Sequence, residues 1–202
     1  ADWGADALGY EGSSPADQQR LVRMARHIVN NFNGIANNSP YSYRTGSALM
    51  GLSLFLSTGG PDNVGGARTV RQGIAAGVAA LKGSQSNAGC NVGGWNYYGQ
   101  SSNGDLSTAQ YAIAGLSAAA AIQADADDTL PNAIPFLNNS QNADGGLKYR
   151  CAYNYNSASA MTAAGGWSYR LSTRAGNSND VQRAMAWLRD NYRYDSHIIT
   201  NW

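Results

Sequence analysis

The densest group of side chains that could do chemistry is a run of carboxylates at Asp125, Asp127 and Asp128, followed by Thr129. A carboxyl group can act as a general acid when burial and neighbouring carboxylates keep it protonated. The same residues also fit a structural role, because Asp and Thr cap helix N-termini and negative charge is favoured there. A helical pattern with Pro131 in its first turn follows the run directly. We therefore predict a helix cap formed by Asp128 or Thr129, with Asp127 and Asp128 kept as candidates for an acid.

A second candidate carboxylate is Asp105, which stands at the end of a loop rich in Gly, Asn and Ser. It opens an apolar helical pattern over residues 105–123 that carries no further charge before Asp125. Its carboxylate can accept hydrogen bonds from the free N–H groups of the first helical turn. We therefore predict that Asp105 is a helix cap, with an acid role as the alternative. Helix 105–123 is apolar or small all round, which indicates that the rest of the chain surrounds it.

Other reaction classes lack the residues that they need. His27 and His197 stand alone, and no Cys/His cluster has the spacing of a zinc site, so we predict no metal. The sequence holds no nucleophile elbow, P-loop or dinucleotide fingerprint, and we predict no cofactor. Aromatic side chains are numerous and could stabilise a cation, but most of them sit in loops, where loop packing and surface recognition are the alternative. The ones concerned are Tyr97, Tyr98, Tyr111, Tyr149, Tyr153, Tyr155 and Trp167.

Composition narrows the class of protein. Charged residues make up 13% of the chain and the net charge is +1, which argues against a nucleic-acid partner because such proteins normally present a basic face. No stretch approaches the roughly 20 apolar residues that a membrane span needs. A surface poor in Lys and Glu and rich in Asn and Ser favours an extracellular or periplasmic protein. The chain begins with Ala1, and we expect a signal peptide to have been removed before it.

Helical periodicity predicts an all-α fold of about seven helices in one domain, residues 1–202, after an irregular segment over 1–14. The helices are expected at about 15–31, 44–57, 69–84, 105–123, 130–139, 157–174 and 180–192. The second, fourth and sixth are nearly free of charge, whereas the others have an apolar stripe and a polar face. This alternation predicts antiparallel hairpins in two layers, with the even helices inside. The repeats run roughly over 15–60, 61–124, 125–176 and an incomplete 177–202.

A short pattern supports the repeat. Leu81-x-x-x-Gln85 returns about 56 residues later as Leu137-x-x-x-Gln141, and each copy precedes a Gly-Gly loop. Such a spacing is typical of helical repeat arrays, in which each hairpin buries its inner helix against its neighbours. Cys90 lies in the first loop and Cys151 beyond the second Gly-Gly pair. If the two loops are equivalent, a disulfide in an oxidising compartment is expected; the alternative is a pair of unpaired loop thiols.

These loops resemble the prenyltransferase/squalene-cyclase repeat, which builds the α/α-toroid of terpene cyclases. In that repeat an outer helix ends with Leu-x-x-x-Gln, Gly-Gly-Trp follows, and an Asp-Ser or Asp-Thr pair opens the inner helix. The first copy here matches at Leu81, Gln85, Gly93, Gly94, Trp95 and Asp105. The second copy matches at Leu137, Gln141, Asp144, Gly145 and Gly146, with Leu147 in place of the Trp. The resemblance implies that the Gln and Trp brace the loop, and Gly165-Gly166-Trp167, inside a predicted helix, is a coincidental match.

The resemblance also bears on assembly and catalysis. A complete toroid has more helices than the seven or so predicted here, which implies about half a toroid, completed by self-association or by another chain. Residues 125–129 fit the D-x-D-D-T motif that supplies the acid in cyclases of the squalene–hopene type. In the family this motif opens an inner helix, whereas here it follows one. The family's acid position corresponds to residues 103–108, where Asp105 is the one carboxylate.

Three functions follow as expectations. The favoured one is a non-catalytic secreted module that binds or self-assembles through its Tyr/Asn-rich loops or its open ends. The alternatives are a terpene-cyclase-like enzyme or a fragment of one, and a carbohydrate-active enzyme, because α/α-toroids also host lyases and hydrolases. A lipid-lined cavity with a buried carboxyl would favour the cyclase. A polar groove with paired carboxylates, or with Tyr and Arg, would favour the carbohydrate-active enzyme.

Overall fold

The computed structural model describes residues 9–100, 103–173 and 178–191, and in these ranges the chain forms seven α-helices and no strand. The helices are α1 (Pro15–Asn31), α2 (Ser42–Ser57), α3 (Val70–Ser84), α4 (Leu106–Ala119), α5 (Ile134–Ser140), α6 (Ser159–Thr173) and α7 (Asn179–Asn191). Short 3-10 segments lie between them at η2 (Gly89–Asn91), η3 (Ala124–Thr129) and η4 (Pro131–Ala133). The predicted all-α class is confirmed.

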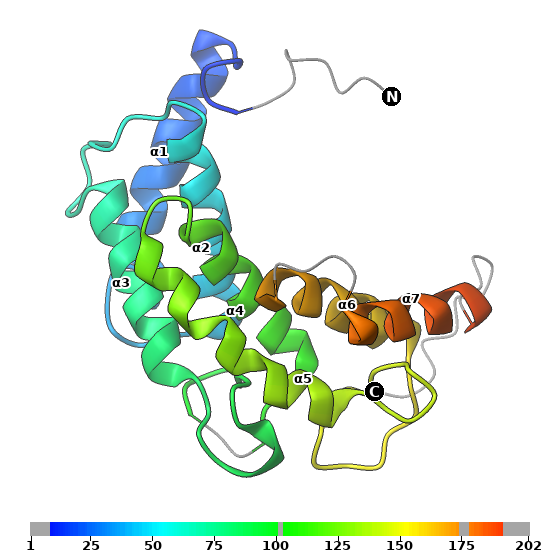
Figure 1. The fold of residues 1–202 in the computed structure, drawn as a ribbon. Coiled ribbons are helices and arrows are strands. Elements are labelled where there is room, and N and C mark those ends of the chain that lie inside the picture. The colour runs from blue at the N-terminus through cyan, green and yellow to red at the C-terminus, as the bar shows by residue number, and fades with distance from the viewer. Residues whose placement is uncertain (1–8, 101–102, 174–177, 192–202) are drawn as a thin grey trace.

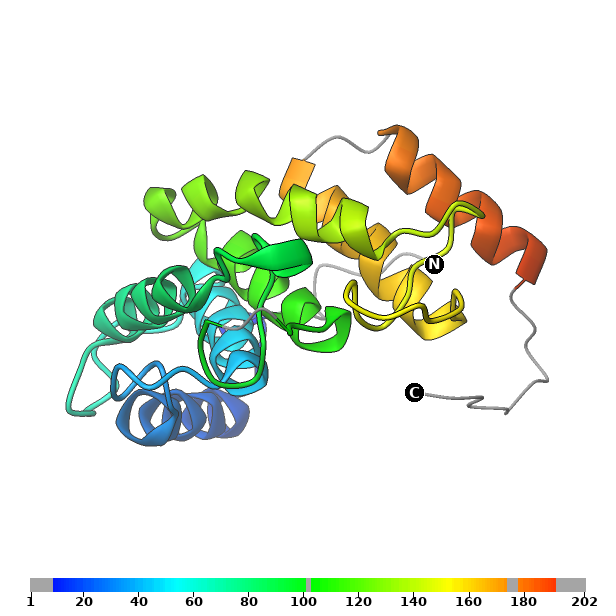
Figure 2. The same cartoon turned by 90° about the horizontal axis from the view of Figure 1, so that it is seen from below.

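The helices pack as antiparallel hairpins in two layers (Figure 1). The inner layer is formed by α2, α4 and α6, because α2 packs chiefly on α4 and α4 in turn packs on α6. Figure 2 shows α1, α3, α5 and α7 along the outer side of the resulting arc. All three inner helices therefore begin at the same end of the array, where the loops that precede them gather.

Local signals explain where the helices begin. Ser14 caps α1 by accepting from the Asp17 N–H at 3.2 Å, and Pro15 fills the first helical position. Thr69 and Gln72 form a reciprocal capping box at the start of α3. Both devices satisfy backbone N–H groups that have no partner inside the helix, so these boundaries can be read from the sequence.

The inner helices are not buried to the same degree. α4 is enclosed on nearly every side, as predicted, with Leu106, Ile113 and Leu116 fully buried. α2 and α6 each keep an exposed stripe, which includes Leu54 at 61% and Trp167 at 46% exposure. The exposed positions follow helical spacing, at Arg44, Ser47, Gly51 and Leu54 on α2 and at Ala160, Ala163, Trp167 and Arg170 on α6. Absence of charge thus predicted the inner layer correctly, but only α4 has neighbouring inner helices on both sides.

The segment after α4 departs from the prediction. α4 ends at Ala119, and the helix expected over 130–139 is replaced by 3-10 turns followed by the short α5. Pro131 and Pro135 have no N–H to donate, so the α-helical hydrogen-bond ladder is incomplete there. Tighter bonds form instead, such as that from the Ala133 N–H to the Leu130 carbonyl at 3.0 Å.

The predicted helix cap at Asp128 or Thr129 is wrong. The residue that precedes η4 is Leu130 and the residue that precedes α5 is Ala133, and neither position has a side-chain cap hydrogen bond. Asp128 and Thr129 lie instead inside η3, which begins without a side-chain cap. The continuous 3-10 path into α5 leaves no extended residue at which a cap could form.

Candidate functional site

The first loop of the repeat is held by two side chains. The Gln85 amide nitrogen donates to the carbonyl oxygens of Gly93 at 2.9 Å and Thr129 at 3.4 Å. The fully buried Trp95 donates its indole N–H to the carbonyl of Leu81 at 2.9 Å. Gln85 therefore ties the loop to the segment that leads into the next outer helix, and Trp95 ties it back to the end of α3.

The second loop repeats this arrangement. The Gln141 amide donates to the carbonyl of Gly145 at 2.9 Å and to the carbonyl of Asp180, at the start of α7, at 3.1 Å. Leu147 occupies the place of the Trp and is fully buried. Because both glutamines make the same pair of contacts, the two loops are equivalent and these residues have a structural role.

The glycines of both loops are required by backbone geometry. Gly93 and Gly145 have φ angles of 86° and 92°, a left-handed conformation that other residues rarely adopt. A Cβ on Gly93 would overlap the carbonyl oxygen of Asn132, and one on Gly145 would lie 2.9 Å from the Arg183 carbonyl oxygen. A Cβ on the neighbouring Gly94 would lie 2.7 Å from the Phe136 ring of α5, and one on Gly146 would lie 2.8 Å from the Trp187 ring of α7. All four glycines thus let the loops lie against the next outer segment.

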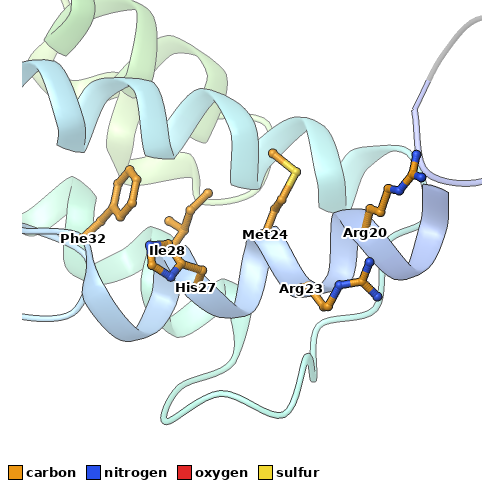
Figure 3. A pocket seen from close by; sticks show the side chains of 6 residues that line it. All are labelled: Arg20, Arg23, Met24, His27, Ile28 and Phe32. Atoms are coloured by element: carbon orange, nitrogen blue, oxygen red, sulfur yellow. The ribbon is translucent and has the colours of Figure 1, made fainter. Parts of the chain in front are cut away.

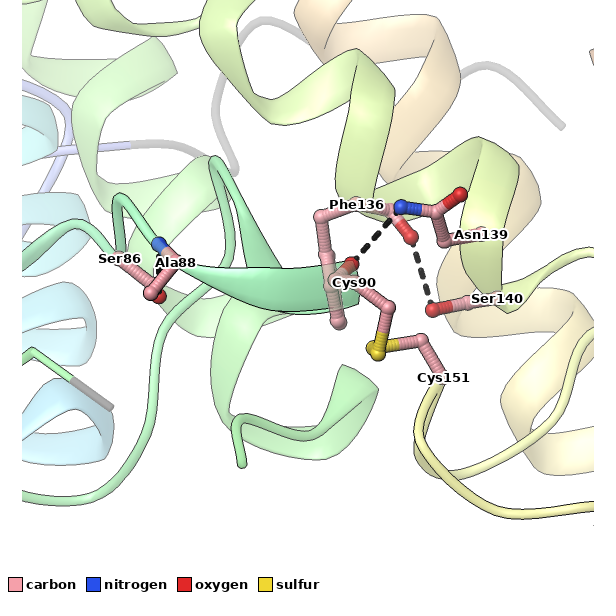
Figure 4. Close-up of a disulfide and its surroundings, with 7 residues drawn as sticks. All are labelled: Ser86, Ala88, Cys90, Phe136, Asn139, Ser140 and Cys151. Carbon is pink, nitrogen blue, oxygen red and sulfur yellow. Dashed lines mark hydrogen bonds between the residues drawn. A yellow bond between two sulfur atoms is a disulfide. The ribbon is translucent and has the colours of Figure 1, made fainter. Parts of the chain in front are cut away.

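A disulfide joins the two loops. Cys90 and Cys151 are bonded across 61 residues, with their Cα atoms 5.9 Å apart. Figure 4 shows the bond beside α5, where the Asn139 side chain donates to the Cys90 carbonyl at 2.9 Å. The pairing predicted from loop equivalence is confirmed, and the alternative of two free thiols is wrong.

The carboxylate run of η3 lacks the environment of a general acid. The Asp125 side chain is 53% exposed and pairs with the Lys82 ammonium at 3.3 Å. A hydrogen bond from Gln123, together with Lys82, lowers the pKa of Asp125. A general acid at neutral pH needs the opposite shift. Asp128 is also exposed, so this run resembles a solvated surface segment.

Asp105 is a buried helix cap, as predicted. Its Oδ1 accepts from the Thr108 N–H at 2.9 Å and from the Ser107 hydroxyl at 2.6 Å. The Ser107 hydroxyl in turn lies 2.6 Å from the Tyr43 hydroxyl. Because the single Ser107 proton goes to the carboxylate, the Tyr43 hydroxyl donates to Ser107. Asp105 therefore anchors a hydrogen-bonded chain that leads outward to a phenol.

Around this chain lies the tyrosine cluster, a group of eight side chains linked by ring contacts or hydrogen bonds. Its members are Tyr41, Tyr43, Tyr97, Tyr98, Tyr111, Tyr149, Tyr153 and Tyr155. Neighbouring ring centroids are separated by 4.9 Å at the closest pairs and 6.3 Å at the widest. These tilted arrangements are typical of favourable aromatic pairs.

The backbone explains why the cluster forms at this end of the array. The first N–H of α2, from Ser42, donates to the Tyr97 carbonyl at 3.0 Å. The first N–H of α4, from Leu106, donates to the Tyr149 carbonyl at 2.9 Å. The starts of α2 and α4 are thus each attached to the loop of the next hairpin, and Tyr97 and Tyr149 hold equivalent places in these attachments. The repeat therefore lines up its tyrosines from one hairpin to the next.

The inner phenols keep their protons. Burial raises the pKa of Tyr43, and the negative charge of Asp105 acts in the same direction. Burial, a hydrogen bond with Tyr97 and the Asp105 charge raise the pKa of Tyr149 to about 12. These hydroxyls are therefore hydrogen-bond donors at neutral pH rather than bases.

The two ends of the tyrosine cluster reach solvent. Tyr98 is 75% exposed and Tyr153 is 48% exposed. The Arg44 guanidinium lies 5.3 Å from the Tyr41 ring centre, and that of Arg150 lies 5.2 Å from the Tyr149 ring centre. The cluster thus offers aromatic surface whose central rings are held in fixed orientations, an arrangement suited to recognition.

Sequence reasoning named most members of the tyrosine cluster but overlooked Tyr41 and Tyr43. These two residues stand at the start of α2, in a hairpin that lacks the Gly-Gly signature. The sequence signal that could have identified them is their position relative to the start of a helix. Tyr41 and Tyr43 flank Ser42, the first residue of α2, just as Asp105 and Ser107 flank Leu106, the first residue of α4. Trp167 lies within α6, so its Gly-Gly-Trp match is inside a helix as predicted.

A separate groove lies on α1, at the other end of the described fold from α7. Figure 3 shows its apolar side chains pointing from α1 toward α2, with arginines at one end. Met24 is the most exposed apolar residue there, at 60%. The groove is lined by Arg20, Arg23, Met24, His27, Ile28 and Phe32.

Metal sites and membrane spans are two further kinds of functional feature. No group of three or more His, Cys, Asp and Glu side chains in those ranges could hold a metal ion. None of the helices described is long and apolar enough to cross a membrane. Comparison of the chain with protein-family models, with curated proteins and with solved structures finds no match.

Proposed function

We propose that the chain is a non-catalytic helical-repeat module that binds its ligand through the tyrosine cluster. The observation that carries the proposal is the connection of eight tyrosines from two loops and two inner helices into one group with exposed ends. Tyr supplies large and rigid amphipathic contact area, while neighbouring Asn, Ser and Gly supply adaptable hydrogen bonds. The loops that carry the cluster have this composition.

The ligand class that fits best is a neutral oligosaccharide. Tyrosine rings offer apolar faces against which the C–H surfaces of a sugar can stack, and their hydroxyls can bond to sugar hydroxyls. Of the charged groups near the rings, Asp105 is fully buried, and the guanidinium groups of Arg44 and Arg150 lie over the rings of Tyr41 and Tyr149.

Binding is favoured over catalysis by the pKa shifts of Tyr149, in the tyrosine cluster, and of Asp125, in the carboxylate run of η3. A lyase or hydrolase needs a base or a neutral acid near pH 7. The raised pKa of Tyr149 makes its phenol a poor base, and the lowered pKa of Asp125 makes that carboxyl a poor acid. The relationship to the prenyltransferase/squalene-cyclase repeat remains our proposal, supported by the equivalent braces at Gln85 and Gln141. Secretion is likewise proposed, with support from the disulfide.

The test is affinity electrophoresis of the whole chain in gels containing a neutral β-glucan, xylan or mannan, with polygalacturonate as an acidic comparison. We expect retardation by at least one neutral polysaccharide and a loss of it in Tyr98→Ala and Tyr153→Ala. Met185→Ala is the matched control, because Met185 is 58% exposed on α7, outside the cluster. Free migration in all neutral gels, or equal retardation of the tyrosine variants, would overturn the proposal.

Self-association is a second candidate, favoured by the exposed apolar groove on α1. Covering this groove with a second copy of the chain would remove apolar surface from water. Light scattering should then give the mass of a dimer or larger assembly for the wild type and of a monomer for Met24→Glu. A monomeric wild type at high concentration would exclude this candidate and leave the binding proposal untouched.

A further inference from the structure

We infer that Tyr41 and Tyr98 form an oxidative coupling site, at which a one-electron oxidant joins the two rings as dityrosine. Their ring centroids are 4.9 Å apart and the ring planes are tilted by 52°. This separation lies at the short end of the range for aromatic pairs, about 4.5–7 Å. Two phenols joined directly by a carbon–carbon bond are only slightly closer and are also twisted, so little movement is needed.

Exposure distinguishes this pair from the rest of the tyrosine cluster. Tyr98 is 75% exposed, which gives an oxidant direct access to one partner, and Tyr41 is half-buried beside it. The ring centroids of Tyr43 and Tyr111 are equally close, at 4.9 Å, but both residues are half-buried, and the Tyr43 hydroxyl is hydrogen-bonded to Ser107. Coupling is therefore expected at Tyr41–Tyr98 first.

The reaction balances with two equivalents of oxidant. Each phenol loses one electron and its hydroxyl proton, which leaves a phenoxyl radical on each ring. The radicals combine through the carbons ortho to the oxygens, and the two displaced ring hydrogens move to the oxygens to restore both phenols. The net products are dityrosine, two protons and two electrons. A haem peroxidase passes those electrons to hydrogen peroxide, which becomes water.

The position of the pair in the repeat gives the bond a structural consequence. The Cys90–Cys151 disulfide already joins the loop before α4 to the loop before α6, across 61 residues. A Tyr41–Tyr98 bond would join the start of α2 to that same loop before α4, and would close a loop of nearly the same length. Oxidation would thus link all three inner-helix ends covalently. Such a link stabilises chiefly by restricting the unfolded chain.

The experiment treats the dilute wild-type chain with a haem peroxidase and hydrogen peroxide. We expect dityrosine emission, a cross-linked peptide pair containing Tyr41 and Tyr98 that is two hydrogens lighter than its parts, and an unchanged monomer mass. The Tm should rise by on the order of 10 °C. Tyr98→Phe and Tyr41→Phe should each lose that peptide pair and the rise in Tm, whereas Tyr153→Phe, at the other exposed end, should keep both.

The inference is overturned if no dityrosine forms, if mass spectrometry places the bond in another pair or between molecules, or if Tyr98→Phe gives the same product yield. It is also separable from oligosaccharide binding. The cross-link is measured on the chain alone, by mass spectrometry and Tm, with no polysaccharide present. Free migration of the wild type in every neutral gel would overturn the binding proposal and leave the Tyr41–Tyr98 peptide pair expected, whereas absence of that pair in a wild type that is retarded would overturn the coupling alone.

Discussion

Gly46 of α2 lies directly against Gly115 of α4, where a Cβ added to Gly115 would come within 2.7 Å of the Gly46 Cα. A Cβ on Gly46 would overlap the backbone carbonyl of Tyr111. The two inner helices therefore meet backbone to backbone, which is possible because neither glycine has a side chain. This contact sets how closely α2 and α4 approach, and so how Tyr43 reaches Tyr111 and Ser107.

Gly115→Ala should destabilise the fold, because a methyl group has no space at the α2–α4 crossing. We expect a loss of about 1–3 kcal/mol in the free energy of unfolding, as is usual for overpacking. Gly51→Ala is the matched control, since nothing lies within 4 Å of its Cβ position in α2. That variant should gain about 0.5–1 kcal/mol from helix propensity. Urea denaturation measures both, and equal effects would contradict the close contact.

The two glutamine braces should contribute similarly to stability. Gln85→Met and Gln141→Met keep the side-chain length but remove the donors to the loop carbonyls. Each should lower the free energy of unfolding by about 1–3 kcal/mol, because carbonyl groups lose their partners. Gln19→Met, at an exposed position on α1, serves as the control. A harmless Gln141→Met beside a damaging Gln85→Met would contradict the equivalence of the loops.

Removal of the disulfide should have a larger effect. The double variant Cys90→Ser/Cys151→Ser should lose about 4 kcal/mol, the cost expected for releasing a loop of this length in the unfolded chain. Wild-type protein in reductant should show the same shift in urea midpoint. Light scattering should give the same mass with and without reductant, because the bond lies within one chain. A change in mass would instead indicate bonds between chains.

Stability should fall at alkaline pH because of the tyrosine cluster. Tyr149 has a folded-state pKa raised to about 12 from an unfolded value of 10.0. Below pH 10 the phenol is protonated in both states and its stabilising contribution is complete. Between about pH 10 and 12 the unfolded chain releases the proton while the folded chain holds it, so the contribution is lost as pH rises. Ultraviolet titration of phenolate, with thermal melts at each pH, should show this, and Tyr149→Phe should flatten the dependence.

The two candidate carboxylates should behave differently on substitution. Asp105→Ala removes a buried cap and the acceptor of Ser107, and should cost about 1–2 kcal/mol. Asp125→Asn alters an exposed side chain and should leave the urea midpoint unchanged. A large loss of stability in Asp125→Asn with none in Asp105→Ala would reverse the assignment of the structural carboxylate.

Much of the fold could be predicted because its signals are local. The start of α1 follows from Ser14 and Pro15, and the start of α4 follows from Asp105, since caps act within one helical turn. The pairing of Cys90 with Cys151 followed from the repeat, because equivalent loops lie on one face. The cap expected at Asp128 was wrong, because the tertiary structure supports a 3-10 path through η3 and η4 that needs no cap.

The sequence by itself thus determined the helices, the order of the layers and the paired cysteines, through periodicity, capping and repeat spacing. Only the tertiary structure decided that Tyr41 and Tyr43 join Tyr97 and Tyr149. These residues belong to different hairpins, and they meet because the first N–H groups of α2 and α4 bond to loop carbonyls of the next hairpin. No local pattern encodes that contact, since it depends on how closely α2 and α4 pack.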